Sequence, residues 1–141
     1  MTARAATVRA VVLDTNIVLD VFVFNDSAAD SVRKALVSRH VDWLATPAMR
    51  VELERVLTYP KIALRLAFYR LSADDVLAKF DEHAHLVAVA PKAGVTCSDP
   101  DDQIFIDLAV QHQCPLLSKD RAVVSLKKRL LAHGVQTHIA I

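Results

Sequence analysis

The feature that most constrains the fold is an alternation of short apolar runs with longer amphipathic stretches. The runs occupy residues 8–13, 41–45, 86–90, 115–118 and 135–141. Each has the length and composition of a strand that is covered on both faces, and helical patterns fill most of the intervals. Strands that alternate with helices predict an α/β fold with a mainly parallel sheet covered by helices.

The helical patterns begin at recognisable capping signals. Asp26 or Ser27 can cap a helix over residues 28–39, and Thr46 followed by Pro47 predicts a helix over residues 47–58. A helix over residues 62–70 and another that opens at Ser72 form a helical insertion between two strands. A further helix ends at His112 and begins in the acidic stretch 98–102, where negative charge favours a helix start.

Composition predicts a folded domain with excess apolar surface, which a partner would cover. With 141 residues, 53% hydrophobic and 23% charged, we expect a single domain over residues 1–141. The mean hydropathy of +0.29 is high for a small chain and favours a homodimer or another bound partner. The absence of a long apolar run and of a signal-peptide pattern predicts a cytoplasmic protein. Cys97 and Cys114 have no metal-ligand spacing and are predicted to be buried, reduced thiols.

Acidic residues recur where predicted elements begin or end. Asp14 follows the first strand, Asp120 follows a later strand, Asp101 and Asp102 lie in the first turn of a helix, and Glu52 lies on the helix that starts at Pro47. Strand ends and the following helix starts meet at one edge of a parallel sheet. Carboxylates gathered there repel one another unless a cation neutralises them, and all-oxygen ligation suits Mg²⁺ or Mn²⁺. These positions therefore predict a metal site.

Structural roles compete with the metal role at each position. Asp99 is a natural helix cap before Pro100, and Asp14 and Asp120 could also be caps. Helical geometry places Glu52 at the edge of the apolar face and Glu54 in solvent. The pattern leaves open whether Asp101, Asp102 or Asp99 is a ligand. The other acidic residues are most simply solvated or capping, namely Asp20, Asp26, Asp30, Asp42, Asp74, Asp75, Asp81, Glu82 and Asp107.

The chain resembles PIN domains over nearly its whole length, in particular the VapC-like toxins of bacterial toxin–antitoxin systems. The matching segments are residues 11–16 (VVLDTN), 51–57 (VELERVL) with 59–61 (YPK), 99–102 (DPDD) with Ala109, and 117–120 (LSKD). Each motif is degenerate, and their order and spacing together carry the resemblance.

The resemblance implies an α/β/α sandwich and a Mg²⁺- or Mn²⁺-dependent ribonuclease. Its acidic quartet would be Asp14, Glu52, Asp102 and Asp120, which serve as catalytic residues and metal ligands. Asn16 and Ser118 would be supporting polar residues. Lys119 departs from the Gly or Arg usual in the family. The resemblance also implies an antitoxin partner, which often inserts a basic side chain among the carboxylates.

Two other function classes compete with a ribonuclease. A phosphatase of the haloacid dehalogenase kind also has an Asp after its first strand, but it needs a second Asp two residues later, where this chain has Asn16. A non-enzymatic binding module is the second alternative. The net charge of +1 excludes a global basic field, so RNA contact would need local charges. The candidates are Arg50, Lys119 and Arg121, which adjoin or lie close to proposed ligands. Trp43 and the Phe residues lie in apolar patterns and are expected in the core, not as platforms that stack on bases.

Overall fold

A parallel sheet of five strands forms the centre of the part of the molecule that the structure describes, residues 9–24 and 26–140 of a computed structural model. The spatial order is β3-β2-β1-β4-β5, and every neighbouring pair is parallel. The strands are β1 (Arg9–Leu13), β2 (Val41–Ala45), β3 (Ala84–Leu86), β4 (Leu116–Leu117) and β5 (Thr137–His138). The predicted parallel α/β fold is therefore confirmed.

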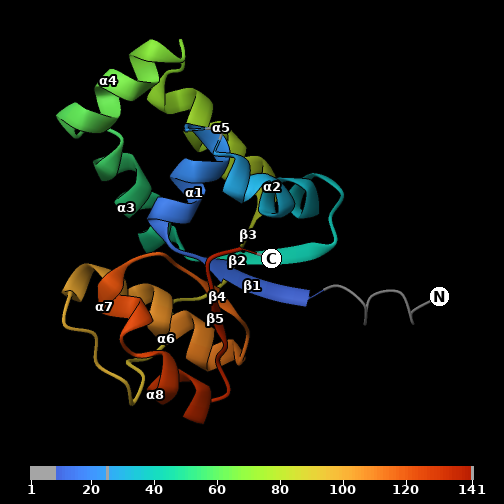
Figure 1. Cartoon of the computed structure of the whole chain (residues 1–141), viewed down its shortest axis with the longest axis vertical. Coiled ribbons are helices and arrows are strands. Elements are labelled where there is room, and N and C mark those ends of the chain that lie inside the picture. The colour runs from blue at the N-terminus through green and yellow to red at the C-terminus, as the bar shows by residue number, and fades with distance from the viewer. Residues whose placement is uncertain (1–8, 25, 141) are drawn as a thin grey trace.

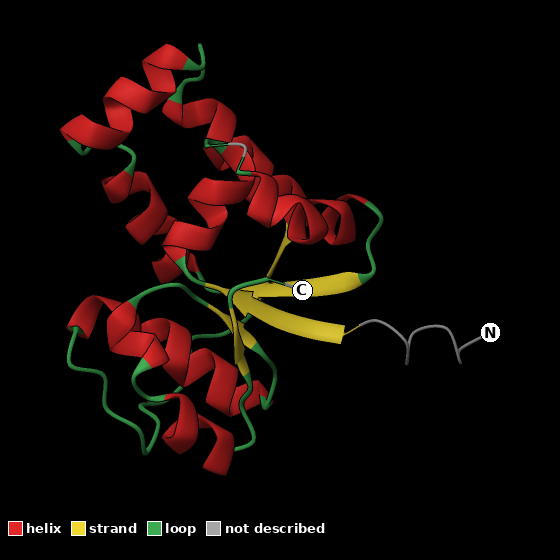
Figure 2. Ribbon diagram, in the orientation of Figure 1, coloured by secondary structure: helices red, strands yellow, loops and turns green. Residues whose placement is uncertain are grey.

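Helices cover both faces of the sheet and make a three-layer sandwich (Figures 1 and 2). On one side lie α1 (Thr15–Phe22), α2 (Asp30–Val37), α3 (Pro47–Val56), α4 (Pro60–Phe68) and α5 (Ala73–His83). On the other side lie α6 (Gln103–His112), α7 (Arg121–Val124) and α8 (Lys127–Ala132). Short 3-10 helices η2 (Ser27–Ala29) and η3 (Pro100–Asp102) precede α2 and α6. The α3–α4 pair projects away from the sheet (Figure 1).

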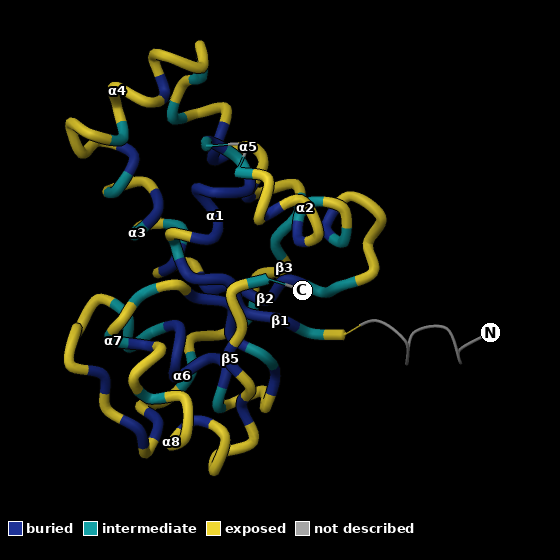
Figure 3. The backbone as a smooth tube through the Cα atoms, viewed as in Figure 1, coloured by how far each residue is buried: buried dark blue, intermediate teal, exposed yellow. Residues whose placement is uncertain are grey.

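The core lies along β1 and β2, because these central strands are covered on both faces. Val12 and Ala45 are fully buried, and Trp43 packs its ring edge-on against Phe80 with 5.1 Å between ring centroids. Figure 3 shows the buried tube running through the sheet and α1, while α4 is largely exposed. The expectation that Trp43 is a core residue is confirmed, and Phe80 and Phe105 share that role.

The strand order creates a topological switch point between β1 and β4. The chain moves from β1 through β2 to β3 on one side, and then returns to place β4 on the other side of β1. In open parallel sheets, the crevice at the carboxyl ends of such strands is the usual ligand site. Asp14 follows β1 and Ser118 follows β4, so both lie at this position.

Several local predictions were wrong. Residues 15–22 carried no helix assignment, yet Asp14 caps α1 there. The strand expected over residues 86–90 is instead β3, which begins directly after α5, and the last strand is shorter than residues 135–141. Phe68 was expected in the core and is 77% exposed, whereas Asp20 and Asp107 were expected to be solvated or capping residues and are buried.

Other predictions were confirmed or stay open. The bounds of β2 agree with the sequence, Thr46 caps α3, and Cys97 and Cys114 are buried and free. Val8, expected in the first strand, lies outside the described residues. The extent of the domain over residues 1–141 stays a prediction. Within the described part, no helix is both long and apolar enough to cross a membrane.

Candidate metal centre

Asp14 is fixed at the carboxyl end of β1 by hydrogen bonds to both carboxylate oxygens. Its Oδ1 accepts from the backbone N–H of Ile17 at 3.0 Å, which caps α1, and its Oδ2 accepts from the hydroxyl of Ser118. The side chain is buried, and burial raises its pKa to about 6 against the opposing effect of these hydrogen bonds. Asp14 therefore caps α1 and also lies at the switch point of the sheet.

Ser118 links the ends of the two central strands. Besides donating to Asp14, its hydroxyl oxygen accepts from the backbone N–H of Asp120 at 3.1 Å. The Oδ1 of Asp120 accepts from the N–H of Ala122 at 2.9 Å and so caps α7. The loop after β4 is thereby ordered by its own polar groups, and the carboxylate of Asp120 is held near Asp14.

Three carboxylates converge at the start of α6. One oxygen from each of Asp99, Asp102 and Asp120 lies within 4.8 Å of the other two. The buried Oδ2 of Asp102 has no hydrogen-bond partner among the described residues. Burial, followed by the charges of Asp120, Asp99 and Asp14, raises the pKa of Asp102 to about 7. A protein that gathers these groups without a cation therefore carries an electrostatic cost.

Glu52 approaches the same region from α3. Its side chain is only 15% exposed, and burial raises its pKa, while Arg55 opposes this rise. The guanidinium of Arg55, one helical turn later, forms an ion pair with Glu52 and lies 3.6 Å from Oδ2 of Asp101. Glu54 is exposed, as its helical position predicts.

A cleft of about 500 Å³ joins these groups. Its lining includes four predicted ligands and one predicted supporting residue, together with two further acids: Asp14, Asn16, Glu52, Asp99, Asp101, Asp102 and Asp120. Apolar and basic side chains of the α3–α4 turn, Tyr59 and Lys61 among them, form the outer wall. The structure thus brings the predicted quartet to one cleft, with Asp14 and Glu52 beside the tight group of three.

The donor set fits a divalent cation that prefers oxygen. The described cleft residues closest to one another offer only carboxylates, without thiolate or imidazole, and this suits Mg²⁺ or Mn²⁺. The orphaned Oδ2 of Asp102 and the raised pKa values of Asp14 and Asp102 are the features that a bound cation would relieve. The chemistry of the cleft therefore supports the proposal that these acidic residues bind a metal ion.

Two of the three basic residues suggested for RNA contact already have acidic partners. Arg50 makes two hydrogen bonds to Asp81 of α5, at 2.7 and 2.9 Å, and Lys119 forms an ion pair with Asp20 of α1. Arg121 is exposed at the start of α7, next to Asp120. Of the three, it is the one for which the described residues provide no acidic partner.

The sequence left the role of Asp99 open, with a cap as the favoured interpretation, and it did not indicate a role for Arg55 or Gln103. Asp99 does cap η3, accepting from the N–H of Asp101 at 3.0 Å, but its carboxylate also joins the group of three. Gln103 accepts from the N–H of Cys97 at 2.7 Å and donates to Val95, which fixes the segment before Asp99. The acidic DPDD segment indicated that Asp99 could be a ligand. No local pattern predicts the contact of Arg55 with Asp101, because these residues are far apart in the chain.

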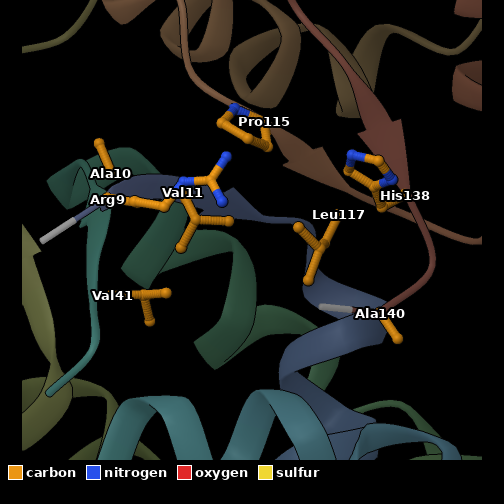
Figure 4. Close-up of a pocket in the computed structure, with 8 residues that line it drawn as sticks. All are labelled: Arg9, Ala10, Val11, Val41, Pro115, Leu117, His138 and Ala140. Carbon is orange, nitrogen blue, oxygen red and sulfur yellow. The ribbon is translucent and has the colours of Figure 1, made fainter. Parts of the chain in front are cut away.

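A second cavity lies elsewhere on the sheet and has a different character. It measures about 190 Å³ and is lined by residues of β1, β4 and β5, including Val11, Leu117 and His138 (Figure 4). Its described lining contains no carboxylate side chain, so it lacks the oxygen ligands of the acidic cleft. The acidic cleft is therefore the better candidate for a metal centre.

Comparison with known proteins agrees with the fold and identifies the family. The structure superposes on a chain of VapBC2 from Rickettsia felis, solved with a DNA fragment from its promoter, with a TM-score of 0.59 and 13% identity. The match covers 91% of this chain and 98% of that chain. No curated protein matches significantly. The PIN domain sequence model, which describes generally metal-dependent nucleases, matches residues 10–122. Because this match spans most of the chain and includes every acidic residue of the cleft, the chain belongs to the PIN domain family.

Proposed function

We propose that this protein is a Mg²⁺- or Mn²⁺-dependent ribonuclease that hydrolyses RNA phosphodiester bonds. The observation that supports this function best is the convergence of Asp99, Asp102 and Asp120 in a cleft that Asp14 and Glu52 also line. An acidic cleft repels the phosphates of RNA, so it suits this substrate only when cations are bound among its carboxylates.

Asp102 and Asp120 would hold a cation, with Asp99 as an additional ligand beyond the predicted quartet. A divalent cation supplies a Lewis acid that activates water and offsets the charge that builds on the phosphate. Asp14 contributes negative charge at a fixed position, because Ser118 and the N–H of Ile17 restrain its carboxylate. Each of its oxygens retains a second lone pair for a ligand. Glu52 faces the cleft from the opposite wall, and Asn16 supplies an amide at the rim.

Local basic groups would bind the RNA backbone. Arg121 is exposed beside Asp120 and is the first of the three predicted contacts to test. Arg50 would have to exchange its pairing with Asp81 for a phosphate, and Lys119 would have to leave Asp20. Contact of Arg50 or Lys119 with RNA would therefore cost the free energy of an existing ion pair, which contact of Arg121 would not.

We further propose that the protein is the toxin of a toxin–antitoxin pair, acts in the cytoplasm and forms a homodimer. Two observations support a protein partner. The VapBC2 chain of Rickettsia felis shares the fold, and α4 exposes the large apolar side chains of Leu64 and Phe68. Mass measurement in solution tests the dimer, and a strictly monomeric protein that stays soluble would contradict it.

The decisive experiment combines metal binding with RNA cleavage. We expect Mn²⁺ to bind in calorimetry, and RNA to be cleaved with Mg²⁺ or Mn²⁺ but not with EDTA. Asp14→Asn, purified in the same way, should lose cleavage and controls for contaminating nucleases. Glu52→Gln should impair activity and Glu54→Gln should not, since the two acids share α3 but only Glu52 faces the cleft. Cleavage that is indifferent to EDTA and to Asp14→Asn would exclude the proposed function.

The phosphatase alternative requires Asp14 to attack phosphorus. Asp14 is 2% exposed, and its two hydrogen bonds fix the orientation of the carboxylate, so it cannot turn toward a phosphorus atom without breaking them. Asn16 cannot supply the acid that such an enzyme needs. Trapping of an aspartyl-phosphate from a small phosphate ester would favour the phosphatase instead.

A further inference from the structure

Two cationic side chains accompany the carboxylates of the acidic cleft: Lys61 lines it, and Arg55 pairs with acids of its lining. Six carboxylates line the cleft, contributed by Asp14, Glu52, Asp99, Asp101, Asp102 and Asp120. Among the described residues, Arg55 is the only cationic side chain that forms an ion pair with any of these six. The cationic side chain that is paired with these acids therefore comes from α3, the helix that also carries Glu52.

Arg55 bridges two segments whose acidic side chains line the cleft. Its Nη2 contacts Oε1 of Glu52 on α3 and lies 3.6 Å from Oδ2 of Asp101 on η3. These two helices stand on different walls of the cleft. The side chain of Glu52 is 15% exposed, whereas that of Arg55 is 51% exposed. The guanidinium thus links α3 to η3 and remains half exposed to solvent.

An ordinary helix-surface ion pair explains only part of this arrangement. Glu52 and Arg55 are three residues apart, a spacing at which opposite charges commonly meet. Such a pair normally lies on the solvent face and contributes little to stability. Here the acid faces a cleft of about 500 Å³, and the second partner belongs to a distant part of the chain. Both features place Arg55 in the electrostatics of the cleft.

We propose that Arg55 is an exchangeable counter-ion: it neutralises Glu52 in the metal-free protein, gives way to a divalent cation, and then offers its guanidinium to a phosphate of the substrate. A guanidinium stays protonated throughout the usual pH range, so Arg55 leaves Glu52 by rotation and not by loss of a proton. Its planar fork suits a phosphate as well as a carboxylate. The phosphate step rests on the proposed ribonuclease function, whereas the exchange with metal does not.

Competition gives the proposal an unusual signature. A side chain that supports the metal ligands weakens metal binding when it is removed, while a competing counter-ion strengthens metal binding when it is removed. The side chain of Arg55 is half exposed, so solvent screens its charge, and its removal is expected to tighten Mn²⁺ binding about fivefold. The direction of the change therefore separates the two roles.

The first test measures Mn²⁺ binding by calorimetry, without RNA. Arg55→Gln is expected to bind Mn²⁺ about fivefold more tightly than wild type, and Arg55→Lys should lie between them. Lys79→Gln removes the same charge from an i,i+3 pair with Glu82 on α5, outside the cleft, and should leave the affinity unchanged. Thermal denaturation verifies that each variant folds. Unchanged or weaker Mn²⁺ binding in Arg55→Gln would overturn the proposal.

The second test measures RNA cleavage at saturating Mn²⁺. Arg55→Gln is expected to raise KM about tenfold with a smaller change in kcat, because a phosphate contact is lost while the metal site is intact. An unchanged KM would overturn the phosphate step alone. Failure of the wild type to cleave RNA would instead reject the ribonuclease function, and the Mn²⁺ competition would still be decided by calorimetry.

Discussion

The hydroxyl of Ser118 donates a hydrogen bond to Oδ2 of Asp14, although the two residues are 104 positions apart in the chain. The same hydroxyl oxygen accepts from the N–H of Asp120. One buried side chain therefore connects the ends of β1 and β4 and sets the spacing of two proposed metal ligands. This link has consequences for stability that can be measured without knowledge of the substrate.

Ser118→Ala should destabilise the protein by about 1–3 kcal/mol, because it leaves buried polar groups of Asp14 and Asp120 without a partner. Urea denaturation measures the free energy of unfolding. Ser118→Thr keeps the hydroxyl and should retain most of the stability. If Ser118→Ala unfolds at the same urea concentration as wild type, the hydroxyl does not hold the two strand ends together.

The metal-free protein should lose stability as the pH rises from 5 to 8. Burial raises the pKa of Asp14 to about 6 and that of Asp102 to about 7, while both ionise near pH 4 in the unfolded chain. Between these values the folded state binds more protons than the unfolded state, so its free energy of unfolding decreases with pH. Asp75 and Asp81, whose pKa values are lowered, act in the opposite direction only below about pH 4.

Urea midpoints measured in EDTA across this range test the pH dependence. Asp14→Asn should flatten the profile, since an amide does not titrate, and Asp74→Asn, on an exposed position of α5, should not. Addition of Mn²⁺ should stabilise the protein most at the alkaline end. A midpoint that rises from pH 5 to 8 in EDTA would contradict the raised pKa values.

Asp102→Asn should stabilise the metal-free protein and abolish its response to metal. The substitution removes a carboxylate that lies against Asp99 and Asp120 and has a buried oxygen without a partner. Tm in EDTA is therefore expected to rise by a few degrees, whereas the Mn²⁺-induced increase of the wild type should disappear. A lower Tm in EDTA together with an intact Mn²⁺ response would show that Asp102 has a structural role.

Lys119→Met should cost about 1–3 kcal/mol of stability, because Asp20 is buried and would lose its ion-pair partner. The expected loss is modest because the side chain of Lys119 is 43% exposed, so solvent screens the ion pair. The double variant Asp20→Asn/Lys119→Met should recover much of the loss. If Lys119→Met instead keeps the wild-type stability and only weakens RNA binding, Lys119 is the RNA contact that its sequence position suggested.

Gln103→Leu should loosen the segment before Asp99 and weaken metal binding without removing any carboxylate. Gln103 bonds to the backbone of Val95 and Cys97, and Asp107 accepts both from Gln103 and from the N–H of Ala93. Hydrogen exchange at Ala93 and Cys97 should accelerate, and the Mn²⁺ dissociation constant should increase. Unchanged exchange at these amides would exclude this anchoring role.

The order of elements was predictable because local patterns report it. Continuous apolar runs predicted the strands that lie in the middle of the sheet, and Thr46-Pro47 predicted the start of α3. Helix α1 was missed because its apolar residues, such as Ile17 and Val21, carry no clear polar face, and only the cap at Asp14 reported its beginning. The bounds of β3 depend on pairing with β2, which a local pattern does not contain.

The sequence by itself determined the residues of an acidic site and the elements that carry them. It placed Asp14, Glu52, Asp102 and Asp120 at strand ends and on helix turns, and the parallel topology brings such positions to one edge. The tertiary structure decided which oxygens meet. Asp99 joins Asp102 and Asp120, Ser118 restrains Asp14, and Arg55 neutralises Glu52. These contacts depend on the relative positions of α3, η3 and the loop after β4, and packing of the whole core fixes those positions.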